Sequence, residues 1–187
     1  MDSRKIIAAL ALCFALCGPT ASAQGEQANE YRLKAAFLFN FAKFINWPSA
    51  AFANAQAPFT LCVLGPDPFG EALDDAFSGK TIADRRIELR RLPTDADARP
   101  CHIIFVSRSQ GRHVTDIVKT LRGASALLVG ESEGFDSSGG TIEFTLEENH
   151  VRFRINPDAA ARAGLVISSK LLALAKIVHD GDSDGKG

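Results

Sequence analysis

The sequence predicts an α/β fold: one three-layer domain with a mostly parallel central sheet of about six strands, flanked by helices and carrying a C-terminal antiparallel hairpin. Helical and strand-like segments alternate along the chain, which is typical of parallel βαβ units. The run Ile103–Val106 is continuously apolar, as expected of a strand covered on both faces. Two later segments, Thr141–Leu146 and Val151–Ile155, alternate strictly between apolar and polar residues, as hairpin strands do.

Local signals place each element. A helix is predicted over Glu30–Asn46, after a polar lead-in at 24–29, and it ends before Pro48 because the residue preceding a proline avoids the helical region. The next strands are predicted at 59–65, 86–92, 101–107 and 126–131, with helices at 69–77 and 110–121. After the hairpin, a short helix runs from Pro157 to Gly164 and a last helix covers 168–179. No repeat or interdomain linker interrupts this order, so we expect one domain.

The hairpin has a predicted register. Pairing Leu146 with Val151 across a four-residue turn keeps both side chains on the core face. The same register sets Glu143 opposite Arg154 and places Arg152 on the same outer face. We therefore predict a cross-strand ion pair on that face.

The first 23 residues have the features of a secretory signal peptide. A basic start at Arg4 and Lys5 precedes an apolar run over Ile6–Cys17, and Ala21-Ser22-Ala23 is a small-residue cleavage site. Cleavage there leaves a domain at 24–179, an acidic tail at 180–187 that we expect to be disordered, and a protein outside the cytoplasm. The alternative is a lipid anchor on Cys13 or Cys17, but leucine precedes both where such sites need a small residue.

Charge and composition exclude some classes of protein. The chain has 21 basic and 22 acidic residues, and removal of the signal peptide takes Arg4, Lys5 and Asp2 with it, which leaves a net charge of −2. A nucleic-acid binder would carry a basic excess. The 13 phenylalanines stand against 1 tyrosine and 1 tryptophan, a balance that suits burial and interfaces better than catalysis.

Two cysteines, Cys62 and Cys101, remain after the signal peptide. In an oxidising compartment a disulfide between them is the simplest interpretation. It would close a loop of about 40 residues and contribute about 3–4 kcal/mol to stability. A redox or metal-binding role is the alternative, but Cys62 lies in an apolar strand-like run rather than in the basic, exposed setting of a reactive thiol.

Catalytic, metal and cofactor motifs are weak throughout. Ser168-Ser169-Lys170 is better explained by helix capping than by a serine/lysine pair. The histidines lack zinc-site spacing. The tail at 180–185 opens like a calcium loop, but the bidentate twelfth ligand would fall beyond Gly187. We therefore predict no catalytic residue, metal or cofactor, and no enzyme.

Two further sets of residues are candidates for binding. In doubly wound sheets ligands lie beyond the carboxyl ends of strands, and here those ends bring Asp67, Ser107 and Arg108, although capping by Ser107 is the simpler role. In the first helix, one apolar face is predicted to hold Leu33, Phe37, Leu38, Phe41, Phe44 and Ile45. Phe39 falls among the polar residues instead, so we expect either a partner protein or the chain's own termini to cover it.

The order and spacing of several segments resemble the YfiR family of periplasmic proteins. These segments are EYRLKAAFLFNFAKF at 30–44, WP at 47–48, LCVLG at 61–65, CHIIF at 101–105, VRFRIN at 151–156 and SSKLL at 168–172. The resemblance implies a small periplasmic α/β domain, often a homodimer, that regulates rather than catalyses. It also implies a disulfide between Cys62 and Cys101. The second cysteine pair of the family's best-known member has no counterpart at 136–144, so a redox switch based on that pair is not expected.

The same resemblance implies partners. The best-known member represses an inner-membrane diguanylate cyclase by binding its periplasmic part, and an outer-membrane lipoprotein sequesters that repressor, which releases cyclic-di-GMP synthesis and biofilm formation. For this chain we predict binding of such a cyclase or sensor, with Phe39, Glu143, Arg152 and Arg154 as contact residues. A periplasmic small-ligand-binding protein, with its pocket near Asp67, Ser107 and Arg108, is the alternative.

Overall fold

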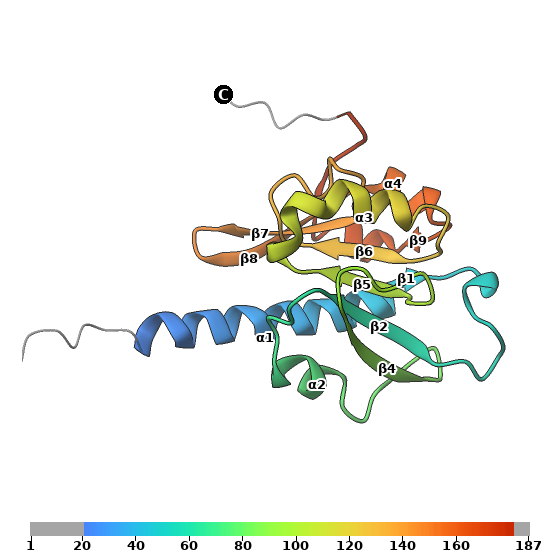
Figure 1. Cartoon of the computed structure of the whole chain (residues 1–187), viewed down its shortest axis with the longest axis horizontal. Helices are drawn as coiled ribbons and strands as arrows, with labels where there is room; N and C mark the ends of the chain where they lie inside the picture. The colour runs from blue at the N-terminus through green and yellow to red at the C-terminus, as the bar shows by residue number, and fades with distance from the viewer. Residues whose placement is uncertain (1–20, 182–187) are drawn as a thin grey trace, which may run out of the picture.

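The computed structural model describes residues 21–181, and its centre is an eight-stranded sheet with the order β10-β8-β7-β6-β5-β2-β4-β3 (Figure 1). The strands are β2 (Phe59–Leu64), β3 (Thr81–Ile82), β4 (Arg85–Leu92), β5 (Ile103–Val106), β6 (Leu127–Gly130), β7 (Ile142–Glu147), β8 (His150–Ile155) and β10 (Lys176–Ile177). A separate antiparallel pair joins β1 (Ile45–Asn46) to β9 (Val166–Ile167). The helices are α1 (Ala21–Phe44), α2 (Glu71–Phe77), α3 (Val114–Thr120), α4 (Pro157–Arg162) and α5 (Ser169–Leu172), with 3-10 turns η2 (Ser49–Ala51) and η3 (Arg108–His113).

The predicted mixed α/β domain is confirmed. Neighbouring strands run parallel except in the pairs β7–β8 and β3–β4. The sheet has eight strands rather than about six because the two-residue strands β3 and β10 add to its edges. Segments this short carry no periodicity from which they could be predicted.

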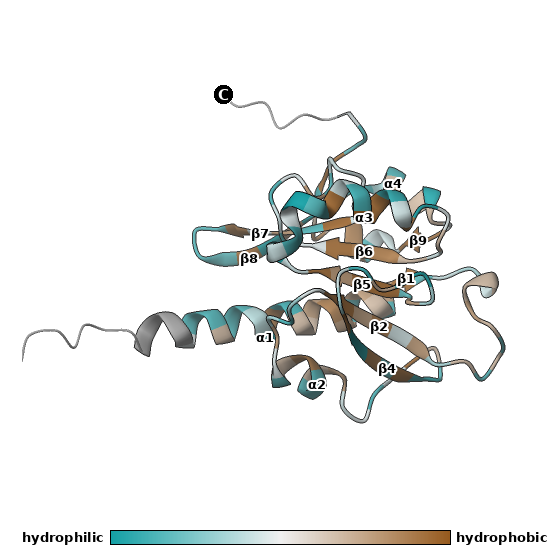
Figure 2. Ribbon diagram, in the orientation of Figure 1, coloured by the Kyte–Doolittle hydropathy of each residue, from teal (hydrophilic) through white to brown (hydrophobic). Residues whose placement is uncertain are grey.

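Helices cover both faces of the sheet. One core cluster joins α1 and α2 to the sheet, and a second joins α3 to the opposite face. Every residue of β2, β5 and β6 is buried, which explains their continuous apolar runs. Figure 2 shows these strands as the brown centre of the molecule.

Helix α1 is longer than predicted, and its buried face is only partly the predicted one: Leu38, Phe41 and Ile45 are buried as predicted. It includes the polar lead-in, whose Gln, Glu and Ala residues favour helix although they lack apolar periodicity. The helix ends at Phe44, and β1 begins at Ile45. Leu33 and Phe44, expected on the buried face, are exposed, whereas Tyr31 and Lys34 are buried.

The hairpin register is confirmed, with Leu146 opposite Val151 and Glu143 opposite Arg154. The turn is tighter than predicted, because Glu147 pairs with His150 and leaves only two residues between the strands. Both turn residues have positive φ, which matches the twist of a two-residue hairpin. The tip projects from the sheet, so Leu146 is exposed rather than on the core face.

The predicted last helix is wrong in its extent. Helix α5 ends at Leu172, and β10 then adds to β8, with Ile177 opposite Ile155. Pairing with a free sheet edge outweighs the local helical preference. Asp180, the first residue of the predicted tail, accepts a hydrogen bond from Asn156 Nδ2 at 2.9 Å and pairs with Arg162. Residues 182–187 of that tail, and residues 1–20 of the predicted signal peptide, lie outside the described residues.

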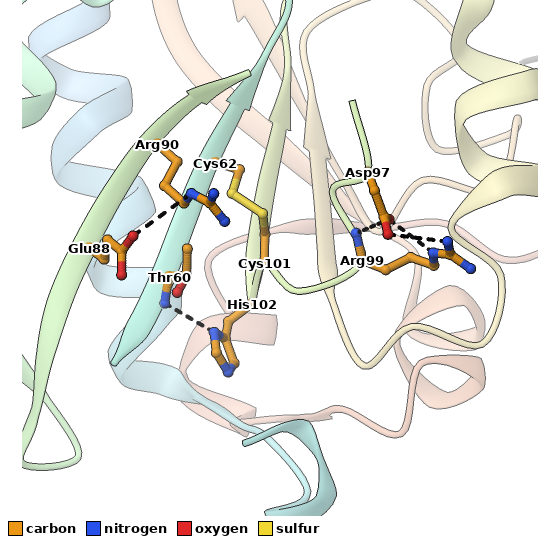
Figure 3. Close-up of a disulfide and its surroundings, with 8 residues drawn as sticks. All are labelled: Thr60, Cys62, Glu88, Arg90, Asp97, Arg99, Cys101 and His102. Atoms are coloured by element: carbon orange, nitrogen blue, oxygen red, sulfur yellow. Dashed lines mark hydrogen bonds and ion pairs between the residues drawn. A yellow bond between two sulfur atoms is a disulfide. The ribbon is translucent and has the colours of Figure 1, made fainter. Parts of the chain in front are cut away.

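The predicted disulfide between Cys62 and Cys101 is present (Figure 3). It joins β2 to the segment before β5, with the two Cα atoms 5.9 Å apart, and both cysteines are buried. The bridge therefore ties two central strands together within the α3-facing core.

Replacing both cysteines, Cys62→Ala with Cys101→Ala, should lower the free energy of unfolding by about 3–4 kcal/mol, because the unfolded chain regains the entropy of a closed loop of 39 residues. Urea unfolding without reductant measures the difference. The wild type should lose the same stability in dithiothreitol, and the double variant should not respond to it. Equal stability of both proteins without reductant would contradict a stabilising disulfide.

His102 links the segment that follows α1 to the start of β2 through two hydrogen bonds. Its Nδ1 accepts a hydrogen bond from the Thr60 N–H at 3.0 Å (Figure 3). Its Nε2–H donates to the Ala51 carbonyl at 3.1 Å, so the ring is neutral. The ring stacks between Phe52 and Phe59, with centroids 4.4 and 5.0 Å away. Burial lowers the pKa of His102 from its ordinary value, because a charged ring would lose its hydration inside the protein.

A depressed histidine pKa means that the unfolded chain binds the proton more readily than the folded one. The stability that His102 contributes is therefore complete above about pH 6.5 and is lost as the pH falls below it. The gap in unfolding free energy between wild type and His102→Gln should narrow from pH 7 to pH 5. Urea titrations at each pH measure it, with His150→Gln, at an exposed hairpin position, as the control. Parallel pH profiles for wild type and His102→Gln would show that His102 does not carry this dependence.

Candidate functional site

The hairpin residues predicted to contact a partner do not share one open surface. Glu143 and Arg154 face each other across β7 and β8, but their side chains are only 4% and 10% exposed. Arg154 Nη2 lies 3.1 Å from Glu143 Oε2, and Arg154 Nε lies 2.7 Å from Asp136 Oδ2. The cross-strand ion pair is confirmed, whereas its expected position on an open face is corrected: both residues lie inside. Arg152 alone of the three is exposed.

The loop between β6 and β7 covers that pair. Its Asp136 N–H donates to Glu143 Oε2 at 3.2 Å, and burial raises the pKa of Glu143. Phe135, 1% exposed, packs so closely on Gly130 and Gly140 that a Cβ on either glycine would lie 2.3 or 2.2 Å from the ring. The sequence signal for this cover is a phenylalanine with glycines near it on both sides, Gly134 and Gly139-Gly140.

Phe39 has a partner within its own chain. Its ring meets the ring of Phe77 in α2 edge-on, with centroids 5.5 Å apart, and Lys80 Nζ lies 4.4 Å from its centroid. Neither the chain termini nor a second protein is needed to cover it. Helix α2 packs along α1. Its Phe77 therefore covers Phe39, which lies outside the apolar face predicted for α1.

The predicted ligand pocket is also divided. Asp67 lines one hollow and Arg108 another, while Tyr31 of α1 borders both and therefore stands between them. Asp67 is already engaged, because Arg91 Nε lies 2.8 Å from its Oδ2 and the Phe69 N–H donates to its Oδ1. Ser107 is buried beside Ser109. The structure does not bring Asp67, Ser107 and Arg108 into one site.

A buried ionic cluster, which the sequence does not predict, lies at the same end of the sheet. Lys34 Nζ lies 2.5 Å from Glu131 Oε2, with both side chains 1% exposed, and it also pairs with Glu30. The Tyr31 hydroxyl donates to both oxygens of Glu131 at 3.1 and 3.2 Å, and the Arg108 N–H donates to Oε1 at 3.2 Å. Burial, followed by the charge of Glu131, raises the pKa of Tyr31. A helix lysine is normally solvated, so sequence alone gave no signal for this burial.

The cluster fixes α1 across the carboxyl end of β6. Glu131 follows β6 directly, and Tyr31 and Lys34 lie one helical turn apart on α1. The Lys34 ammonium also lies 4.7 Å from the Tyr31 ring centroid. Because the helix is held here, its first turns extend beyond the sheet on the same side as the hairpin tip (Figure 1).

A groove of about 720 Å³ lies between these two projections. Its apolar lining includes Leu33 and Phe37 from α1 and Leu146 and Val151 from the hairpin. Leu33 and Leu146 are each 45% exposed, so the groove presents two large aliphatic side chains to solvent.

Two guanidinium groups, those of Arg108 and Arg152, line the same groove. Neither forms an ion pair with any residue in the range 21–181. Glu26 and Glu30 border the helix side, and Glu30 is engaged by Lys34. A mixed lining of apolar side chains and unpaired arginines is compatible with a protein-binding surface, in which arginine is enriched. Of the predicted site residues, Arg108 and Arg152 lie here.

Residues 21–181 hold no group of three or more His, Cys, Asp or Glu side chains placed to bind a metal ion. Within the same residues no helix has both the length and the apolar character needed to cross a membrane. Ser168 caps α5 by accepting from the Lys170 N–H.

Replacing Lys34 with methionine should lower the free energy of unfolding by about 3–5 kcal/mol, because Glu131 would remain buried without its cation. Adding Glu131→Leu to Lys34→Met should restore much of that loss, since it removes the unpaired charge. Urea unfolding of the variants measures both effects. Lys119→Met, which breaks an exposed pair with Asp116, is the control and should change little. A cost for Lys34→Met no larger than for Lys119→Met would contradict the role of the cluster.

Comparison with known proteins agrees with this architecture. A crystal structure of a conserved domain protein from Vibrio cholerae O1 biovar El Tor strain N16961 superposes with a TM-score of 0.52 at 13% sequence identity, over 64% of this chain and 54% of that one. At this identity the likeness concerns the fold alone, and the match spans about half of that protein. Residues 31–176 match the family model described as YfiR/HmsC-like. Since that match covers most of the sequence, the chain belongs to the YfiR/HmsC-like family of periplasmic regulatory proteins.

Proposed function

We propose that this protein binds the periplasmic module of an inner-membrane diguanylate cyclase or a related sensor and represses it, thereby limiting cyclic-di-GMP synthesis and biofilm formation. Family membership supports a regulatory rather than a catalytic role. The observation that carries the proposal is the groove between α1 and the hairpin, where exposed Leu33 and Leu146 lie beside the unpaired Arg108 and Arg152.

Repression requires unequal binding to two states of the sensor. A regulator shifts such an equilibrium only by the difference in its affinity for the inactive and active states. The groove walls are a helix anchored by Lys34 and a hairpin anchored by Arg154, so both walls are fixed before binding. A rigid surface of this kind loses little conformational entropy when it binds, and it selects one sensor conformation rather than adapting to both.

Export and release of repression complete the proposal. The signal peptide at 1–23 delivers the protein to the periplasm, where the bridge between Cys62 and Cys101 forms. An outer-membrane lipoprotein that binds the same groove would compete with the sensor and release it. A homodimer of the repressor would present the groove twice and raise the avidity for a dimeric sensor.

A small-ligand-binding protein is the second candidate. The groove volume of about 720 Å³ lies within the range of small-molecule sites, and Arg108 with Arg152 would hold an anionic group. In this function a metabolite, rather than a protein segment, occupies the apolar floor.

The two functions predict different effects of Arg152→Glu. For a sensor-binding groove, the variant should bind the purified periplasmic module of the neighbouring membrane cyclase at least tenfold more weakly, because a carboxylate replaces an unpaired cation at the interface. Calorimetric titration measures the affinity, and cyclase activity in membranes should rise in parallel. Arg122→Glu, at an exposed position away from the groove, is the matched control.

Arg154→Glu is unsuitable for this test, because it would bury a third carboxylate beside Asp136 and Glu143. Unchanged binding of the module to Arg152→Glu would refute the groove as the sensor site. If the module binds neither variant nor wild type, and an anionic metabolite raises the melting temperature of the wild type but not of Arg152→Glu, the second candidate is the function.

A further inference from the structure

One edge of the central sheet is open along most of an eight-residue strand. Strand β4 pairs with β2 on one side over Ile87–Leu92, whereas on the other side β3 covers only Arg85 and Arg86. The outward N–H and C=O groups of 87–92 form no hydrogen bond with any residue that the structure describes. Figure 1 shows β4 at the rim of the sheet.

The two edges of the sheet differ in their protection: β4 carries charged side chains but no covering strand over 87–92, whereas β10 leaves only residues 150–153 of β8 without a neighbouring strand. At the opposite end, β10 has only two residues, too short to serve as a template for another strand. Strand β4 contains no proline or glycine, and its register with β2 runs for six residues without a bulge. Alternate residues of this stretch point their backbone groups outward, which leaves about three donor and acceptor sets unpaired.

The side chains of β4 give this edge a basic character. The strand carries four arginines and one glutamate. Arg91 is engaged by Asp67 and Asp74 of neighbouring elements, and Arg85 donates to backbone carbonyls. Two cations therefore remain for a partner, Arg86 and Arg90.

Arg86 and Arg90 lie on one face of β4, four residues and about 13 Å apart. Arg86 has no ion pair among the described residues, and Arg90 reaches Glu88 only at 3.8 Å, with both side chains more than 40% exposed. Figure 3 shows Glu88 and Arg90 on the face of β4 beside the disulfide. The two arginines match carboxylates spaced four residues apart on an added strand.

We propose that the open edge of β4 binds an extended acidic segment of a partner protein, which adds as a ninth strand to the sheet. The backbone of 87–92 supplies the hydrogen bonds, and Arg86 and Arg90 select carboxylates on the incoming strand. A second copy of this chain is a poorer occupant, because two β4 strands would bring their excess of arginines together. This site is separate from the groove, since β2, β5 and β6 lie between β4 and β7.

The test uses a fluorescent peptide, acetyl-Glu-Val-Thr-Val-Glu-Val-amide, with its carboxylates at the required spacing. Fluorescence anisotropy should show saturable binding to the whole protein, and the double variant Arg86→Glu with Arg90→Glu should weaken it at least tenfold. Arg122→Glu and Arg152→Glu, which lie elsewhere, should leave it unchanged, so failure of the groove and failure of this edge are distinguishable. A peptide with lysine in place of both glutamates should not bind.

Backbone pairing is tested by methylating the peptide amides on alternate residues, in either phase. A strand uses one of its edges, so one phase should abolish binding and the other should retain it. Hydrogen exchange of the amides at 87–92 should slow when the peptide binds. Equal binding of both methylated peptides, no binding to the wild type, or concentration-dependent self-association abolished by the double variant would overturn the proposal.

Discussion

The buried ion pair of Lys34 with Glu131 is the interaction on which the position of α1 depends. It joins the helix to the end of β6, and the Tyr31 hydroxyl and the Arg108 N–H complete the hydrogen bonds of the same carboxylate. An ion pair this deeply buried contributes little net stability against an apolar alternative, but it tolerates only one placement of the helix. The exposed Leu33 and the groove beside it follow from that placement.

The buried ion pairs of Arg154 hold the hairpin in position, as the ion pair of Lys34 holds α1. Arg154 lies between Glu143 and Asp136, so the loop from β6 closes over the outer face of β7 and β8. Both projections at this end of the molecule are thus held by ionic contacts beneath them. They also contact each other, because Phe37 and Phe41 of α1 pack against the rings of Phe144 and Phe153 in the hairpin. These contacts leave the groove between the two projections open.

Much of the fold could be predicted from the sequence, because apolar runs and strict alternation are local signals. They predicted the central strands and the register of Glu143 with Arg154. Burial set by distant partners was not predictable. The sequence around Lys34 contains no signal for Glu131, 97 residues away, and the sequence around Phe39 contains none for Phe77. The predicted contact residues Glu143 and Arg154 were misplaced for the same reason, since the loop that covers them has no periodicity.

The central claim is that a regulator of this family binds its sensor in the groove between α1 and the hairpin. Hydrogen exchange followed by mass spectrometry, with and without the periplasmic module of the cyclase, tests it directly. Amide exchange should slow at 25–37 in α1 and at 146–152 in the hairpin, the segments that line the groove. Slowed exchange confined to α3 and α4, with α1 and the hairpin unchanged, would contradict the account.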